Sequence, residues 1–248
     1  MKTIVLASAS PRRREILKNL GLSFEVLSAD VDETSDERDP ARLCELLAAR
    51  KGEAAVSRLA REARDLSGLL VIASDTVVAV DAPAASVGSA RAAAGKEPDK
   101  EPSAAGLSSV SGLSFSEKTA DFDYTVCKNS SFEILGKPAD AADARRMLRL
   151  LSGRPHRVVS GVYLWMNGVS AVSHDVTEVV FDRLSDDEID RYIASGEPFG
   201  KAGAYAVQGL ASSFVSGIRG DYFNVVGLPV HRMCALFRET FPNEPPLV

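Results

Sequence analysis

An aspartate inside an apolar segment is the residue of this sequence that most needs a chemical explanation. Asp75 lies in LLVIASDTVVAV, residues 69–80, where most side chains are aliphatic or β-branched. A buried carboxylate costs free energy unless it is paired, hydrogen-bonded or bound to a metal ion. Asp75 could simply mark a strand end. Because ligands of α/β proteins gather at the carboxyl ends of strands, we predict instead that it belongs to a site.

Two serines and two arginines near the N-terminus form a second candidate group. Ser8, Ser10, Arg12 and Arg13 lie where a β-prone segment gives way to a helical one. Free backbone N–H groups and the positive end of a helix bind anions at such a junction, and guanidinium groups strengthen the attraction. Arginines at helix starts are also often only solvated, and no GxGxxG or GxxxxGK[ST] motif accompanies these. A phosphate site is therefore one of two open interpretations.

Other polar residues are weaker candidates when each is taken singly. Asp32 and Glu33, in an acidic loop, could supply a second carboxylate or be merely solvated. Lys137 and Lys201 lie on glycine-containing turns that can bring an ammonium group up to a phosphate, although loop lysines are normally surface residues. Gln208 precedes a glycine, and its amide could read a nucleobase edge as donor and acceptor.

The elements that must position these residues alternate between strands and helices. Hydrophobic patterning predicts strands at 3–6, 24–27, 69–80, 157–166, 169–181 and about 214–218. Capping residues and 3.6-residue periodicity predict helices that begin at Pro11 and Pro40 and after Asp140 and Ser185, and a final helix from Pro229 to Phe241. Asn167-Gly168 between two long strands indicates a hairpin. The pattern is that of an α/β fold.

One segment lacks any such pattern. Of residues 82–117, 24 of 36 are Ala, Ser, Gly or Pro. Such a composition cannot bury enough apolar surface to offset the entropy of ordering. We predict a single catalytic domain over residues 1–248, interrupted by a disordered insertion at about 82–131.

Composition and charge exclude several classes of function. The formal net charge of −5 argues against binding of a nucleic acid polymer. The sequence has no apolar run near the roughly 20 residues of a membrane span, and no signal-peptide pattern, so we expect no membrane association and a cytoplasmic protein. The spacing of the three cysteines and three histidines matches no zinc motif, so any metal must rest on carboxylates.

Taken together, six segments resemble the Maf family of nucleoside triphosphate pyrophosphatases, in family order. They are LASASPRRREIL at 6–17, VDET at 31–34, ARKGEA at 49–54, ASDTVV at 73–78, GKP at 136–138 and GEPFGKAGAYAVQG at 196–209. The resemblance implies a mixed α/β fold with an elongated, twisted sheet flanked by helices and a central cleft between two lobes. That fold is similar to inosine triphosphate pyrophosphatases, and a homodimer is common in the family.

The implied reaction is hydrolysis of a nucleoside triphosphate between the α- and β-phosphates, with a divalent cation, Mg²⁺ or Mn²⁺, as cofactor. Asp75 matches the family's proton acceptor, and Glu33 and Asp75 match its metal ligands. The implied substrate-binding residues are Ser8, Arg12, Arg13, Lys51, Thr76, Lys137, Lys201 and Gln208.

Arg12, Thr76 and Gln208 resemble the subgroup that acts on dTTP and UTP; the subgroup that acts on 7-methyl-GTP carries Trp, Gln and Glu there. CTP and modified pyrimidine nucleotides remain open as further substrates. Many members have Glu in place of Gly136 and Asp in place of Gly200. The alternative function is a non-catalytic, nucleotide-binding regulator of cell division. A degenerate binder would have little reason to keep the costly Asp75, which favours catalysis.

Overall fold

The structure, a computed structural model, describes residues 3–28, 31–81 and 132–248. The predicted insertion lies outside the described residues, so its disorder stays a prediction. Within the described residues no helix is long and apolar enough to cross a membrane.

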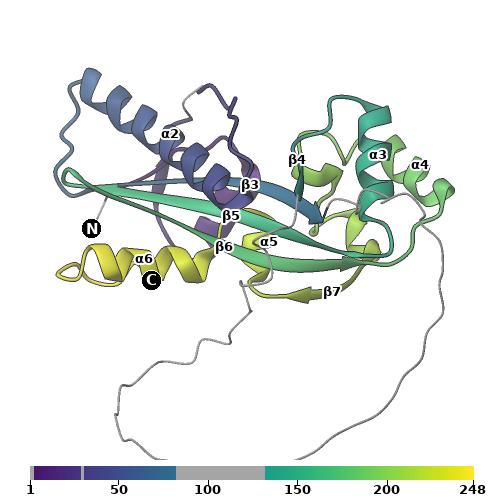
Figure 1. Cartoon of the computed structure of the whole chain (residues 1–248). Helices are drawn as coiled ribbons and strands as arrows, with labels where there is room; N and C mark the ends of the chain where they lie inside the picture. Colours follow the sequence, from purple (N-terminus) through teal and green to yellow (C-terminus); the bar gives the residue numbers. More distant parts are fainter. Residues whose placement is uncertain (1–2, 29–30, 82–131) are drawn as a thin grey trace, which may run out of the picture. The chain divides into compact units, whose positions relative to one another are not determined.

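The described part of the chain is built on a seven-stranded mixed sheet (Figure 1). Its strand order is β2-β1-β3-β5-β6-β7, with β4 paired to β3 off this path. The strands are β1 (Thr3–Leu6), β2 (Phe24–Val26), β3 (Leu69–Asp81), β4 (Phe132–Leu135), β5 (Pro155–Met166), β6 (Val169–Phe181) and β7 (Val215–Arg219). The β1–β2 and β1–β3 pairs are parallel, and the others are antiparallel. The mixed α/β fold is confirmed.

The central strand β3 is open along part of one edge. On one side it pairs with β5 from Leu70 to Ala79. On the other side it pairs with β1 only up to Ile72, and with β4 only from Val78 onward. Among the described residues, no strand therefore pairs with residues 73–77, which include Asp75, on that edge.

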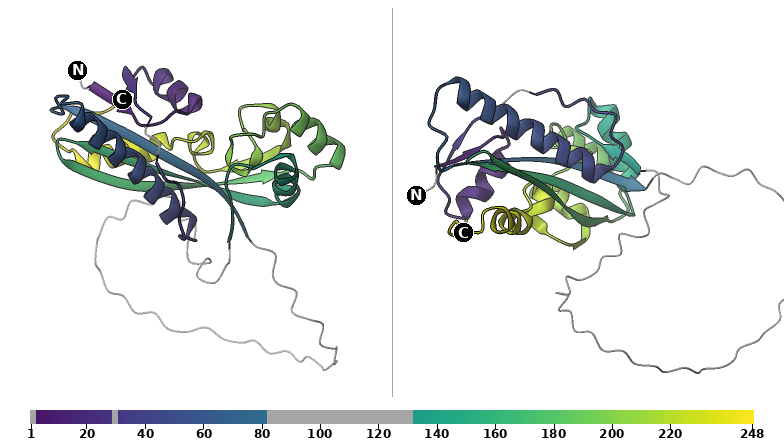
Figure 2. Two further views of the ribbon diagram at one scale, coloured as in Figure 1. Left: turned by 90° about the horizontal axis from the view of Figure 1, so that it is seen from above. Right: turned by 60° about the vertical axis from the view of Figure 1, so that its left-hand side comes forward.

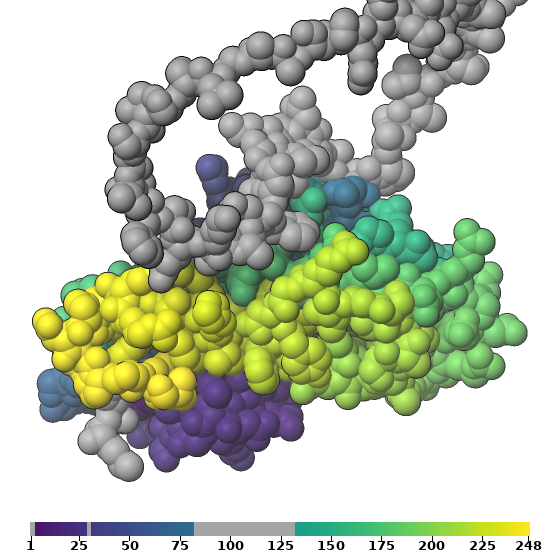
Figure 3. Space-filling view, turned by 90° about the horizontal axis from the view of Figure 1, so that it is seen from below, coloured from purple at the N-terminus to yellow at the C-terminus, as the bar shows by residue number. Residues whose placement is uncertain are grey.

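Helices cover both faces of the sheet (Figures 1 and 2). The long helix α2 (Pro40–Arg61) packs on one face, against β3 and β5. The opposite face is covered at one end by α1 and α6 and at the other end by α3 and α4, with α5 near its middle. Their bounds are α1 (Pro11–Asn19), α3 (Ala141–Leu151), α4 (Asp186–Ala194), α5 (Tyr222–Val226) and α6 (Val230–Thr240). Figure 3 shows α6, in yellow, beside the N-terminal segment, in purple.

Two separate hydrophobic clusters lie on the face opposite α2. The first contains Ile72 of β3 and side chains of α1 and α6. The second contains Val78 of β3 and side chains of α3 and α4. Alternate residues of a strand share a face, so Ser74 and Thr76 occupy the interval between the clusters. This polar interruption of β3 is where a cleft can form.

The α2 face is packed more tightly. A Cβ atom built on Gly161 of β5 would lie 2.3 Å from the carbonyl oxygen of Cys44, so only glycine lets α2 approach this closely. Trp165 of β5 packs against the cluster formed by α2, β1, β3 and β5.

The structure corrects one expectation about Asp75. The sequence placed Asp75 in the second half of a strand at 69–80. The observed strand, Leu69–Asp81, confirms the predicted strand, but Asp75 is the seventh of its 13 residues and lies at its middle. Beyond Asp75 the neighbour of β3 on this edge changes from β1 to β4. Helix α5 and two short 3₁₀ helices, Ala202–Ala204 and Leu210–Phe214, were not predicted, since they are too short to show periodicity.

Candidate active site

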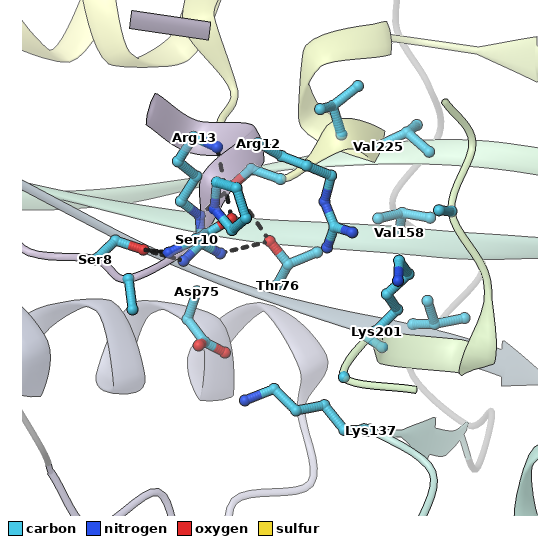
Figure 4. A pocket seen from close by; sticks show the side chains of 18 of the residues that line it. Ser8, Ser10, Arg12, Arg13, Asp75, Thr76, Lys137, Val158, Lys201 and Val225 are labelled. Carbon is cyan, nitrogen blue, oxygen red and sulfur yellow. Dashed lines mark hydrogen bonds between the residues drawn. The ribbon is translucent and has the colours of Figure 1, made fainter. Parts of the chain in front are cut away.

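A cavity of about 510 Å³ opens at the unpaired edge of β3. Its wall combines residues from many parts of the chain. They are residues 7–13 at the start of α1, Ser28, Glu33, Lys51 of α2, the middle of β3, Lys137 after β4, Val158 of β5, and residues within 199–207 and 225–227. Figure 4 shows 18 of the lining side chains and labels ten of them. In that view Asp75 points toward Lys137, while Thr76 lies beside the two arginines of α1.

Lys51 contacts both carboxylates that line the cavity. The Nζ atom of Lys51, on α2, lies 2.8 Å from Oε1 of Glu33 and also forms a hydrogen-bonded ion pair with Asp75. Lys137 approaches Glu33 at 3.7 Å. The hydrogen bond from Lys51 lowers the pKa of Glu33. Four side chains from distant segments are thus linked: Lys51 contacts both Glu33 and Asp75, and Glu33 also approaches Lys137.

Arg13 is a buried guanidinium group bonded to neutral oxygens. Its Nε donates to the carbonyl of Gly227 at 2.7 Å, and its two terminal nitrogens donate to the hydroxyls of Ser8 and Thr76, each at 3.1 Å. Burial lowers the pKa of Arg13, and the nearby Asp75 carboxylate opposes that shift. Because its hydrogen-bond partners among the described residues are neutral oxygens, the group retains positive charge with which to attract an anion.

Ser10 explains why Arg13 is held at this place. Its side chain accepts from the backbone N–H of Arg13 at 3.5 Å and caps α1, whose first residue is Pro11. The cap fixes the first turn, so that both Arg12 and Arg13 reach the cavity wall. The helix start predicted from the sequence is observed. The binding of an anion there stays a prediction.

Arg12 and Lys201 line the opposite part of the wall. Lys201 donates to the carbonyl oxygen of Glu197 at 2.5 Å. Desolvation lowers the pKa of both Arg12 and Lys201, and the charge of Arg12 lowers that of Lys201 further. Two partly desolvated cations this close to each other are stabilised by an anion between them.

Glu197 is a residue that sequence reasoning missed. Its carboxylate accepts from the hydroxyl of Tyr192 at 2.9 Å and from the backbone N–H of Leu210 at 3.0 Å. It thereby fixes the segment that carries Lys201 and the following wall residues. The sequence feature that could have identified Glu197 is its position between a glycine and a proline within the GEPFGKAGAY motif.

The far end of the cavity is apolar. It is formed by Val78, Val158, Val207 and Val225 together with Tyr205. The hydroxyl of Tyr205 is hydrogen-bonded to His156 Nε2 at 2.9 Å, behind the wall. These side chains carry no signal in the sequence that separates them from ordinary core residues.

Nine of the ten predicted site residues line this cavity: Ser8, Arg12, Arg13, Glu33, Lys51, Asp75, Thr76, Lys137 and Lys201. Gln208 does not; it is exposed and lies just beyond Val207 in the wall. Its proposed contact with a base therefore stays a prediction. Gly136 is outside the wall, and Gly200 is part of it.

The carboxylates suit a cation that is shared with a bound ligand. Among the described residues, no group of three or more His, Cys, Asp or Glu side chains could hold a metal ion by itself. Glu33 and Asp75, however, share one ammonium group, so their oxygens converge on one point. Mg²⁺ is commonly held by one or two carboxylates plus substrate phosphates. The residues present fit that mode of binding.

Comparison with known proteins agrees with this geometry. The family model described as Maf-like protein matches residues 3–122 and 119–240. A protein of Alkaliphilus metalliredigens is 36% identical over 244 residues, covering 97% of each chain. One of Pelotomaculum thermopropionicum is 39% identical over 243 residues (96% of this chain, 97% of the relative), and one of Chromobacterium violaceum is 40% identical over 237 (95% and 93%). All three are named dTTP/UTP pyrophosphatase. The resemblance seen in the six sequence segments is confirmed, and the chain belongs to the Maf-like protein family.

Proposed function

We propose that this protein is a nucleoside triphosphate pyrophosphatase that hydrolyses dTTP and UTP to the nucleoside monophosphate and pyrophosphate. The names of its relatives support the proposal, and one feature of the cavity carries it. Five basic side chains and two carboxylates line a cavity of a chain whose net charge is −5. Such a local excess of positive charge, next to an apolar surface, suits a ligand with a polyanionic tail and a flat ring.

The basic residues would bind and orient the phosphates. Arg13 supplies N–H donors from a rigid, buried position, and the first turn of α1 adds the positive end of a helix. Lys137, which is largely exposed, and Lys201 come from loops on the other side of β3. Phosphoryl transfer depends mainly on such charge neutralisation and positioning.

Asp75 would act on the attacking water. Water adds its oxygen to the α-phosphorus, the bond from that phosphorus to the bridging oxygen breaks, pyrophosphate leaves, and the proton of the water passes to the Asp75 carboxylate. Lys51 holds this carboxylate in place. A divalent metal ion, Mg²⁺ or Mn²⁺, held by Glu33, Asp75 and phosphate oxygens, would neutralise the developing charge on the phosphates.

The apolar end would receive the base. Val158 and Val225 offer a surface for a pyrimidine ring, and Arg12, Thr76 and Gln208 are proposed to select its edge. Gln208 does not line the cavity, so contact with the base would require its side chain to approach from beyond Val207. A single catalytic domain, a cytoplasmic location and a homodimer complete the proposal. The first two rest on the sequence patterns, and the homodimer rests on the family resemblance.

The test is to incubate the purified protein with a panel of nucleoside triphosphates and Mg²⁺ or Mn²⁺. We expect equal amounts of monophosphate and pyrophosphate, and the highest kcat/KM with UTP and dTTP. Nucleotide binding without pyrophosphate release would instead favour the non-catalytic regulator. Light scattering during gel filtration tests the homodimer separately.

A further inference from the structure

A row of hydrogen bonds runs from the cavity into the protein behind Thr76. Arg13 donates to Thr76 Oγ1 at 3.1 Å, Thr76 Oγ1 lies 2.8 Å from Ser160 Oγ, and Ser160 Oγ donates to the carbonyl oxygen of Asn224 at 3.0 Å. Ser160 is directly opposite Thr76 in the β3–β5 register. It is fully buried and is not part of the cavity wall.

The two ends of this row determine where the protons lie. A guanidinium group can only donate, a carbonyl oxygen can only accept, and each hydroxyl has one proton. Because Ser160 gives its proton to Asn224, the proton between the hydroxyls must come from Thr76. The reverse direction would leave the buried carbonyl of Asn224 without its donor, which is costly.

The competing acceptor for the proton of Thr76 is already occupied. The carbonyl oxygen of Gly227 lies 3.4 Å from Thr76 Oγ1, but it receives Arg13 Nε at 2.7 Å and Ser74 Oγ at 3.0 Å. A carbonyl oxygen has two lone pairs, and both are used by these shorter bonds. The proton of Thr76 therefore stays with Ser160, and the remaining lone pair of Thr76 can only accept.

We propose that Ser160 sets the base preference of the enzyme by keeping the Thr76 hydroxyl an obligate hydrogen-bond acceptor. This inference rests on the proposed function. Val78, two residues beyond Thr76 on the same face of β3, begins the apolar end of the cavity, so Thr76 is placed at the edge of the proposed base site. Uracil and thymine present an N3–H donor to such an acceptor. Cytosine presents an N3 lone pair, which an acceptor repels.

The direct test replaces Ser160 with alanine. In Ser160→Ala the Thr76 hydroxyl can turn its proton toward the cavity, so hydrolysis of CTP should rise and the UTP:CTP ratio of kcat/KM should fall, by roughly 10-fold or more. Thr177→Val is the matched control: Thr177 is equally buried, and its hydroxyl bonds Asp221 and Asn224 but is not part of the row from Arg13 through Thr76 to Ser160. The ratio should not change in this control. An unchanged ratio in Ser160→Ala overturns the inference.

A wild-type measurement keeps the test decisive if Ser160→Ala does not fold. UTP methylated at N3 has no N3–H, so it should be hydrolysed about as poorly as CTP, roughly 10- to 100-fold below UTP. Equal hydrolysis of UTP and its N3-methyl derivative would show that N3–H is not read and would refute the role of Ser160. Absence of hydrolysis of every triphosphate would instead refute the proposed function itself.

Discussion

Asp75 and Thr76 are adjacent in β3 and serve opposite sides of the sheet. Asp75 is bound by Lys51 of α2, whereas Thr76 accepts from Arg13 of α1 and is bonded to Ser160 of β5. Both nevertheless line one cavity, because in the described part of the chain residues 73–77 have no strand neighbour on one edge. The cleft therefore reaches both faces of the sheet at this gap.

Replacing Asp75 with asparagine should abolish turnover while leaving the fold and nucleotide binding intact. The amide is nearly isosteric but cannot accept a proton, so we expect kcat to fall by about 10²–10⁴-fold. Pyrophosphate release measures kcat, and calorimetry measures binding. Asp81→Asn, at an exposed carboxylate further along β3, is the control and should behave as wild type. Near-normal kcat in Asp75→Asn would remove Asp75 from the mechanism.

Replacing Glu33 with glutamine should raise the metal concentration needed for half-maximal activity. Gln keeps the shape but removes one of the two carboxylates that share Lys51. A titration with Mg²⁺ at saturating UTP should shift by about 10-fold or more, within the range typical when support of a metal site is lost. Asp36→Asn, an exposed acid of the same loop, should not shift it. An unchanged titration in Glu33→Gln would leave Glu33 as a solvated loop residue.

Gly161 should tolerate no side chain. A Cβ there would lie 2.3 Å from the backbone oxygen of Cys44, and backbone cannot move aside as a side-chain end can. We expect Gly161→Ala to lower the free energy of unfolding by about 3 kcal/mol, measured by urea denaturation. Gly136→Ala, where nothing lies within 4 Å, should change it by less than about 0.5 kcal/mol. Equal effects of the two substitutions would contradict the close α2–β5 contact.

His156 should make the protein less stable in acid. Burial lowers its pKa to about 3, whereas the unfolded chain has the ordinary value of about 6.5. Below about pH 6.5 His156 is protonated in the unfolded state but stays neutral in the folded state. The free energy of unfolding therefore falls as the pH drops toward 3. Between pH 7 and pH 5 this amounts to about 2 kcal/mol. His156→Gln should be less stable at pH 7 but should lose less on acidification, which urea denaturation at both pH values can measure. An identical pH dependence would contradict a neutral His156.

Residues 82–131 should be replaceable by a tight turn. Asp81 and Phe132 are direct partners in the β3–β4 ladder, so a two-residue Asn-Gly turn can join them. We expect the melting temperature and kcat/KM for UTP to be roughly unchanged. Limited proteolysis of the full chain should cut within the replaced segment first. A folded but inactive deletion variant would show that this segment contributes to the cavity.

The sequence predicted strands and helices well where their patterns are long. The paired strands joined at Asn167-Gly168 and the capped start of α1 depend on local signals, and both are observed. The gap in β3 could not be predicted, because strand pairing depends on partners far away in the sequence. Asp75 could be singled out as an acid within an apolar strand, but its position at the gap between β1 and β4 could not.

The site shows the same limit. Asp75 could be singled out because a carboxylate in an apolar strand needs a chemical explanation, whereas Lys51 could be named only through the family resemblance. Ser160 and Val158 could not, since a buried serine and a valine are ordinary in a strand. Their importance comes only from the register that sets Ser160 opposite Thr76.

The packing of Trp165 has an optical consequence. It is the only tryptophan of the chain, and it lies in the cluster beneath α2 and not in the cavity wall. Its fluorescence should therefore report the melting of that layer and respond little to a nucleotide in the cavity. Phe199, an aromatic wall residue that is 42% exposed, is the place where a second tryptophan would make ligand binding visible.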